Sequence, residues 1–245
     1  MLGTLLKRNS NHHTANDIHA KSGNANLNRL RAAVLGSNDG IVSVASIVLG
    51  VAGATDARGS IFTAGLAGLV AGALSMGVGE YVSVSTQRDT ERAYIKHEAW
   101  ELHNQPDEEL TELAEMYQAK GVSSKTAKQV AKELTAKDAL KAHLDVELNI
   151  DAEALTNPWQ AAIASLLSFT VGALIPLVSI LVATPHTRFL VTFIAVSVAL
   201  FLTGYLSAHA GGASHRRAVL RVVVGGALAM IVTYGIGHLF GTTIK

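Results

Sequence analysis

Long apolar runs alternate with short polar connections along this chain, except where one long polar stretch separates the second run from the third. Five runs reach roughly the 20 residues that a helix needs to cross a bilayer. Open strands would leave backbone groups unsatisfied in lipid, so all five runs are predicted to be helices. The fold class expected is an all-α integral membrane protein whose five transmembrane helices cover residues 32–54, 61–84, 160–183, 189–208 and 222–240.

The polar stretch, residues 87–158, is predicted to form a helical domain inserted between the second and third spans. Helical sequence continues from the second span to about Asn104, and a new helix should begin at Pro106 and end at Lys120-Gly121, with the glycine as its C-cap. Another helix should follow Ser123-Ser124, and Thr135 with Asp138 resembles a capping box that opens one more. The expected organisation is a polar tail at 1–30, spans one and two at 31–86, the domain at 87–158, and spans three to five at 159–245.

Basic residues in the connections predict the topology. Five Lys or Arg residues precede the first span, nine lie in the domain, and three lie between residues 209 and 221, whereas the other connections contain only Arg58, Arg188 and Lys245. Positive residues favour the cytoplasmic side. The N-terminus, the domain and the 210–221 loop are therefore expected in the cytoplasm and the C-terminus on the far side. The first thirty residues have no apolar core and do not resemble a cleavable signal peptide.

Acidic residues are concentrated in the inserted domain. Fifteen of the nineteen Asp and Glu residues lie between Asp89 and Glu153, and nine basic residues in the domain leave it at about −6. Nucleic acid is therefore a poor partner, and the absence of cysteine excludes disulfides and thiolate metal sites. Two further acids, Asp39 and Glu80, lie inside or at the end of apolar runs, where a carboxylate is expensive and is by default a functional candidate. Both features indicate a protein that handles cations.

The glutamates of the domain follow helical spacing. Glu98 and Glu101 share one helix face, and so do Glu109, Glu112 and Glu115. If the two faces meet across the turn at Pro106, they form an oxygen-rich cage suited to Mn²⁺, Fe²⁺, Mg²⁺ or Ca²⁺, and a nearby imidazole would favour the transition metals. His97 and His143 are the candidates for it. The alternative is that these are ordinary solvated acidic helices.

One face of the second span consists of small residues, Ala64, Gly68 and Gly72. Such faces allow helix backbones to approach closely, either within one subunit or between two. We predict a dimer formed through the first two spans.

Several segments resemble the vacuolar iron transporter (VIT/CCC) family in its prokaryotic form, and the resemblance covers nearly everything after residue 28. The matching segments are Asn38 to Val42, Gly72 to Ser83, Thr86 to Glu91, Pro106 to Glu115, Asp138 to His143 and Gly226 to Met230. The resemblance implies a homodimer with five spans per subunit and a cytoplasmic metal-binding domain between spans two and three. It also implies a host membrane, namely the plasma membrane in a prokaryote, or a vacuolar or other organelle membrane in a eukaryote.

The resemblance also implies site residues. The metal-ligating glutamates of the family fall on Glu98, Glu101, Glu109, Glu112 and Glu147, with His143 and Glu115 as further candidates. The membrane pathway falls on Asp39 and Met76, and Glu80 is expected to add a carboxylate. Two departures concern ion preference and coupling: Gly68 and Ala32 replace acids of the characterised eukaryotic pattern, and His143 and Leu144 replace a pair of methionines.

The function expected is proton-coupled export of divalent iron, manganese or both from the cytosol, in metal homeostasis and detoxification. Fe²⁺ or Mn²⁺ is the bound and transported ion, with no prosthetic group, and the expected partners are the bilayer, a second copy of the chain and protons. The chain is expected not to be an enzyme. One alternative is a membrane-tethered ferritin-like iron oxidase, although the Glu-x-x-His pairs of di-iron bundles are missing. Another is a metal-sensing scaffold, which would need no Asp39.

Overall fold

The computed structural model describes residues 33–152 and 155–243, and no strand occurs within them. The described chain divides into two compact units, each treated by itself below. Residues 33–81 and 159–243 form the first, which we call the membrane unit, and Val82–Pro158 form the second, which we call the acidic unit. The polar tail expected at residues 1–30, and Ala32, lie outside the described residues.

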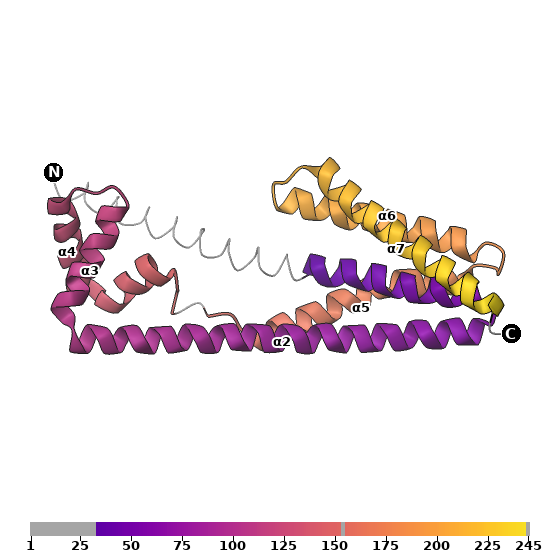
Figure 1. Cartoon of the computed structure of the whole chain (residues 1–245), viewed down its shortest axis with the longest axis horizontal. Coiled ribbons are helices and arrows are strands. Elements are labelled where there is room, and N and C mark those ends of the chain that lie inside the picture. Colours follow the sequence, from indigo (N-terminus) through magenta and orange to yellow (C-terminus); the bar gives the residue numbers. More distant parts are fainter. Residues whose placement is uncertain (1–32, 153–154, 244–245) are drawn as a thin grey trace, which may run out of the picture. The chain divides into compact units, whose positions relative to one another are not determined.

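Five helices are long and apolar enough to span a bilayer, which confirms the five predicted spans. They are the first helix, Ala33–Ala54, followed by α2 (Arg58–Asn104), α5 (Pro158–Val182), α6 (Arg188–Ala210) and α7 (His215–Thr243), as Figure 1 shows. With 47 residues, α2 is about 70 Å long at 1.5 Å per residue, more than twice the hydrocarbon thickness. Its apolar part ends near Val84, and the polar remainder continues to Asn104 as predicted.

Glycines let the first helix lie very close to α5. A Cβ atom at Gly40 would overlap the backbone carbonyl oxygen of Phe169, and one at Gly172 would overlap that of Ser37. Only glycine permits this approach, which brings many van der Waals contacts where lipid supplies no hydrophobic driving force. The core around the crossing is apolar and fully or nearly fully buried, and it includes Ile41, Val44, Val48, Phe169, Ala173, Leu177, Val196, Leu200 and Met230.

The small-residue face of α2 also packs inside the chain. A side chain at Gly68 would meet Ile47 of the first helix, and one at Gly72 would overlap the ring of Phe169 in α5. Two glycines of this face therefore receive large side chains of their own chain. A dimer through the first two spans stays a prediction.

The acidic unit contains the end of α2, then α3 (Pro106–Ala119), α4 (Ser124–His143) and a π-helical turn, Leu144–Leu148. As predicted, α3 has Pro106 in its first turn, and Gly121 has a φ of +94° just beyond its end. Ser123 caps α4 by accepting a hydrogen bond from the Thr126 amide at 3.4 Å. A small core holds these helices together, formed by Leu113, Ala114, Ala131 and Ala142.

The predicted capping box in α4 is wrong in one respect, the identity of the cap. Asp138 has extended backbone angles (φ −166°, ψ 93°) inside the helix, and its carboxylate accepts a hydrogen bond from the Lys141 amide at 3.0 Å. This is N-cap geometry. A new helical segment does begin here, but Asp138 caps it and Thr135 does not, because the Thr135 hydroxyl is buried without a hydrogen-bond partner in the described structure.

Candidate metal centre

Three elements of the acidic unit place titratable side chains around one point. Glu98 comes from the polar end of α2, Glu109 from the first turn of α3, and His143 from the last turn of α4. The turn at Gln105 reverses the chain between α2 and α3, which lets the first two carboxylates face each other. All three side chains are buried, with exposed fractions of 3% for Glu98, 4% for Glu109 and 0% for His143.

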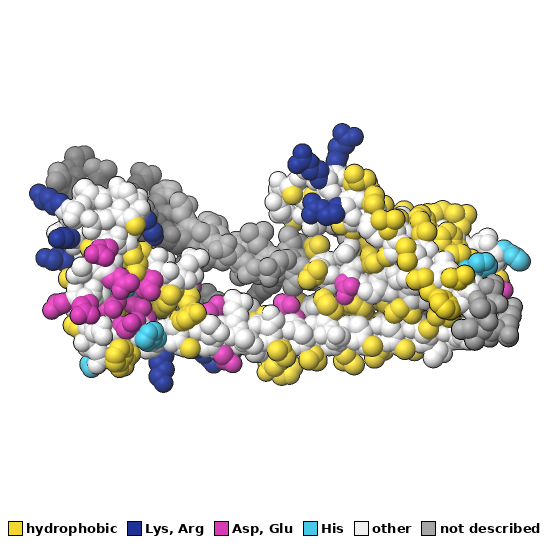
Figure 2. Space-filling model, viewed as in Figure 1, with side chains coloured by type: hydrophobic (Ala, Val, Ile, Leu, Met, Phe, Trp, Pro, Cys, Tyr) yellow, Lys and Arg dark blue, Asp and Glu magenta, His cyan; other side chains and the backbone are white. Residues whose placement is uncertain are grey.

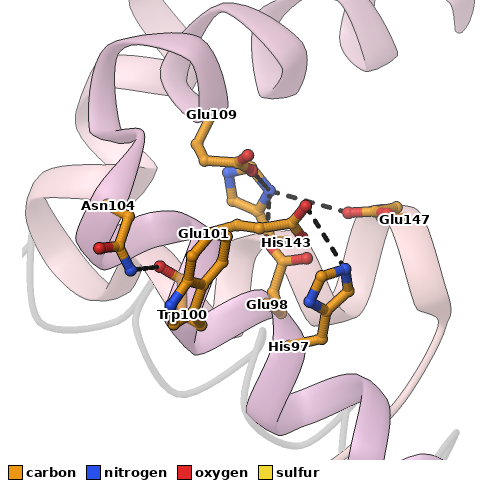
Figure 3. A network of polar contacts seen from close by, with 8 residues as sticks. All are labelled: His97, Glu98, Trp100, Glu101, Asn104, Glu109, His143 and Glu147. Atoms are coloured by element: carbon orange, nitrogen blue, oxygen red, sulfur yellow. Dashed lines mark hydrogen bonds and ion pairs between the residues drawn. The ribbon is translucent and has the colours of Figure 1, made fainter.

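The ligand-type atoms of these residues lie close together. His143 Nδ1 is 3.0 Å from Glu98 Oε1, 3.5 Å from Glu109 Oε2 and 3.9 Å from Glu147 Oε2. Figure 3 shows the carboxylates of Glu98, Glu109 and Glu147 directed toward the His143 ring. Glu98, Glu109 and His143 each offer one ligand atom, and these three atoms all lie within 4.8 Å of one another.

Burial and mutual repulsion set the protonation of this cluster. Burial, followed by the charges of Glu147, Glu109 and Glu101, raises the pKa of Glu98 from 4.5 to about 7. The pKa of Glu109 is raised for the same reasons, burial first and Glu112 next. Burial lowers the pKa of His143, although the neighbouring carboxylates oppose that shift. Near neutral pH the centre therefore combines a neutral imidazole with a Glu98 carboxyl that is only partly ionised.

These atoms fit a divalent metal ion. Bonds of about 2.1 Å place two ligands of one ion at most about 4.2 Å apart, which the three distances from His143 Nδ1 satisfy. Glu98 Oε1, Glu109 Oε2 and both His143 ring nitrogens are buried without a hydrogen-bond partner in the described structure. Buried polar atoms without partners are costly, and a bound cation would satisfy them. One imidazole with carboxylates suits Fe²⁺, Mn²⁺ or Zn²⁺ better than Mg²⁺ or Ca²⁺.

The other predicted ligands lie at the edge of the cluster or outside it. The side chains of Glu101 and Glu147 are 31% and 32% exposed, so both can reach the centre from its rim. Glu112 is exposed and lines an acidic surface depression with Asp107, Glu108, Thr111 and Glu115. Its charge still raises the pKa of Glu109. Among the described residues Glu115 is not part of the buried cluster, and His97 lies 3.6 Å from Glu101 and stacks with Trp100.

Sequence reasoning underrated His143, which it named only as a further candidate. The residue is fully buried, and every ion-pair distance of the inner cluster includes it. Its helical spacing to Glu147, four residues on, was a usable signal. The π-helical turn that follows His143 was not readable from sequence. It widens the helix where Glu147 turns toward the cluster, and such turns often occur at functional sites.

The membrane candidates occupy the membrane unit. Asp39 is partly buried in the unbroken first helix and accepts a hydrogen bond from the Ser43 hydroxyl at 2.8 Å. Met76 is partly buried and packs against the core, and Glu80 is partly buried one turn further along α2. The described contacts do not join these three residues into one cluster.

Comparison of the sequence with known proteins shows the family of this chain. A model of the VIT family matches residues 30–238. The chain is 44% identical over 215 residues to a vacuolar iron transporter of Acanthamoeba castellanii, covering 87% of this chain and 79% of that protein. It is 36% identical over 214 residues to vacuolar iron transporter homolog 2.1 of Arabidopsis thaliana, covering 87% and 82%. Vacuolar iron transporter homolog 1 of Oryza sativa subsp. japonica is 39% identical over 213 residues, covering 86% and 74%. The five spans, the match along most of the chain and these relatives agree that the chain is a multi-pass membrane protein of the VIT family.

Proposed function

We propose that this protein exports divalent iron, manganese or both from the cytosol in exchange for protons. The observation that carries the proposal is the buried Glu98–Glu109–His143 cluster, in a chain whose relatives are named as iron transporters. The cluster supplies mixed nitrogen and oxygen ligands of the kind that Fe²⁺ and Mn²⁺ accept. Iron transport follows from the family, while manganese, the direction and the proton coupling are our additions.

The two units would divide the work between them. The acidic unit captures metal through Glu98, Glu109 and His143, with Glu101, Glu112 and Glu147 guiding ions toward it by their charge. In the membrane unit, Asp39 offers a carboxylate at lipid depth, with Met76 and Glu80 along α2 as further ligands. The distribution of basic residues supports a cytoplasmic N-terminus and acidic unit, so capture takes place from the cytosol.

Protons would drive release because they compete with metal for the same carboxylates. A ligand must lose its proton before it binds metal, so an acidic compartment on the far side releases metal and loads protons. The raised pKa of Glu98, about 7, makes capture itself sensitive to cytosolic pH. A homodimer formed through the first two spans is part of the proposal.

Metal flux in liposomes tests the proposal. The purified chain is reconstituted into vesicles with an acidic interior, and Fe²⁺ or Mn²⁺ is added outside under anaerobic conditions. We expect metal to accumulate inside while the interior becomes more alkaline, and a protonophore, which dissipates the pH gradient, should abolish the metal accumulation. Metal binding without flux would support a sensor or scaffold instead. Oxygen consumption with conversion of Fe²⁺ to Fe³⁺, again without flux, would support the oxidase.

A further inference from the structure

A long groove lies on the surface of the α6–α7 hairpin in the membrane unit. Its volume is about 760 Å³, and its walls are almost entirely apolar. Its polar lining residues are Ser197 along α6 and, at one end, Tyr205 of α6, which lies near His215 and Arg216 of α7. The apolar part is lined by Phe193, Ile194, Val198, Phe201, Val219, Leu220 and Val223.

The groove has the length of one membrane leaflet. Along α6 it extends from Tyr205 to Phe193, twelve residues, or about 18 Å at 1.5 Å per residue. Half of a hydrocarbon core of about 30 Å is about 15 Å. An acyl chain with its head at the Tyr205 end would therefore fit the groove and end near the bilayer midplane.

Unpaired positive charge surrounds the polar end. Arg216, Arg217 and Arg221 are exposed on the first two turns of α7, and the sequence contains no Asp or Glu after residue 153. None of the ion pairs among the described residues includes these arginines. Figure 2 shows the basic side chains gathered at the α6–α7 turn, with apolar surface continuing along both helices. The Nε2 atom of His215 is buried there without a hydrogen-bond partner in the described structure.

We propose that this groove binds an anionic phospholipid, with one acyl chain along the apolar walls and the phosphate held by Arg216, His215 and the neighbouring Arg217. The guanidinium fork matches phosphate oxygens, and basic residues beside a membrane helix attract anionic headgroups. Nothing in this site resembles the metal centre, and its existence does not depend on the metal that the protein carries.

A second copy of the chain is a poorer occupant of the groove. A twofold contact would place the same patch on both sides, bringing the arginines of one hairpin against those of the other. Because α6 and α7 contain no acid, neither copy could neutralise the other. Buried like charges without partners are strongly unfavourable. An anionic lipid satisfies both the apolar walls and the charge.

Native mass spectrometry of the full chain, delipidated in detergent, tests the charge requirement. Phosphatidylglycerol and phosphatidylcholine with identical acyl chains are titrated separately. We expect the first bound phosphatidylglycerol molecule to bind more tightly than the first phosphatidylcholine. Arg216→Gln should weaken binding of that first phosphatidylglycerol roughly fivefold, the effect of about one basic residue at an anionic surface. Arg58→Gln, which removes an exposed arginine from the start of α2, is the control and should leave it unchanged. Equal binding of both lipids, or equal effects of the two variants, would overturn the proposal.

Filling the groove with a larger side chain tests whether the acyl chain lies in it. Val198 is 53% exposed in the groove, and Val178 is 52% exposed on α5 outside it. Val198→Trp should reduce binding of the first phosphatidylglycerol, while Val178→Trp should not. If Val198→Trp dissociates a dimer and leaves lipid binding intact, the groove is a subunit interface and the lipid site is wrong. An unchanged melting temperature in detergent shows that the membrane unit of each variant has folded.

Discussion

His143 holds its imidazole among three carboxylates while neither ring nitrogen has a hydrogen-bond partner in the described structure. A buried histidine is usually hydrogen-bonded, so this arrangement indicates a ring placed for another ligand. Burial keeps the ring neutral by lowering its pKa. Neutral imidazole is the form that binds metal, and its nitrogen gives the site its preference for transition metals over Mg²⁺.

Removing a buried ligand should weaken metal binding far more than removing an exposed acid. In the full chain, Glu98→Gln or Glu109→Gln should reduce Mn²⁺ affinity by about tenfold or more, since even loss of an outer-shell partner commonly costs that much. Glu115→Gln removes the same charge from an exposed position on α3 and should have little effect. Isothermal titration calorimetry in detergent makes the comparison. Similar losses in all three variants would mean that the acidic unit attracts metal only by its overall charge.

Metal affinity should fall as the pH is lowered from about 7.5 to 5.5. Because the pKa of Glu98 is about 7 in the folded protein, this carboxyl is protonated below neutral pH and must release its proton to bind metal. Each displaced proton weakens binding about tenfold per pH unit in that range. Titrations in two buffers of different ionisation heat would count the released protons. A constant affinity across this range would contradict the raised pKa.

The raised pKa of Glu98 also makes the stability of the metal-free protein depend on pH. An acid with a raised pKa in the folded state keeps a proton that the unfolded chain releases, so its contribution to stability is present below pH 4.5 and is lost as the pH rises toward 7. Metal should restore stability at neutral pH, because it replaces the missing proton.

At the scale of helices, the sequence predicted those features that depend only on residues close together in the chain. The five spans follow from charge-free apolar runs, and α3 follows from Pro106 at its start and Gly121 beyond its end. The residues that pack against the glycine face of α2 were not predictable, because Ile47 and Phe169 come from other helices. The break at Asp138 was misassigned by three residues, because Thr135 and Asp138 are both good caps and only packing chooses between them.

Two glycines of α2 should respond oppositely to alanine. Alanine favours a helix over glycine by about 1 kcal/mol, but at Gly72 the added methyl would overlap the Phe169 ring, and such overpacking costs about 1–3 kcal/mol. Gly72→Ala should therefore lower the melting temperature in detergent. Gly79→Ala, with nothing within 4 Å of the new methyl, should leave it unchanged or raise it. Equal behaviour would mean that Gly72 does not receive Phe169.

The cap at Asp138 should protect the amide that it binds. Asp138→Ala removes the acceptor of the Lys141 N–H, a loss of about 1 kcal/mol, so hydrogen exchange at Lys141 should quicken about fivefold. Asp138→Asn keeps an acceptor and should preserve most of the protection. Asp145→Ala, an exposed acid in the next turn, serves as the control. Unchanged exchange in Asp138→Ala would show that the break is held by packing alone.

For the whole molecule, α2 is the element that belongs to both units, since its apolar part lies in the membrane unit and its polar end carries Glu98. The proposed function thus assigns capture to the polar end of α2, and passage to Asp39 of the first helix with Met76 and Glu80 in the apolar part of α2. The segregated acids in the sequence indicated both proposed roles, since Asp39 and Glu80 lie in apolar runs and fifteen of the nineteen acids lie in the acidic unit. It could not show which glutamates are buried, because that depends on how α2, α3 and α4 pack.

The central claim is that a divalent metal crosses the membrane by way of Asp39, and flux through Asp39→Asn tests it most directly. Asparagine keeps the size and can still accept the Ser43 hydrogen bond, but it removes the charge that a divalent ion needs and the site that a proton would use. Asp56→Asn, in the exposed turn before α2, is the matched control. We predict that Asp39→Asn abolishes Fe²⁺ and Mn²⁺ flux and the accompanying proton movement in liposomes, while metal binding by the acidic unit and flux through Asp56→Asn stay at wild-type levels. Wild-type flux through Asp39→Asn would contradict the account, because the ion would then cross the membrane by another route.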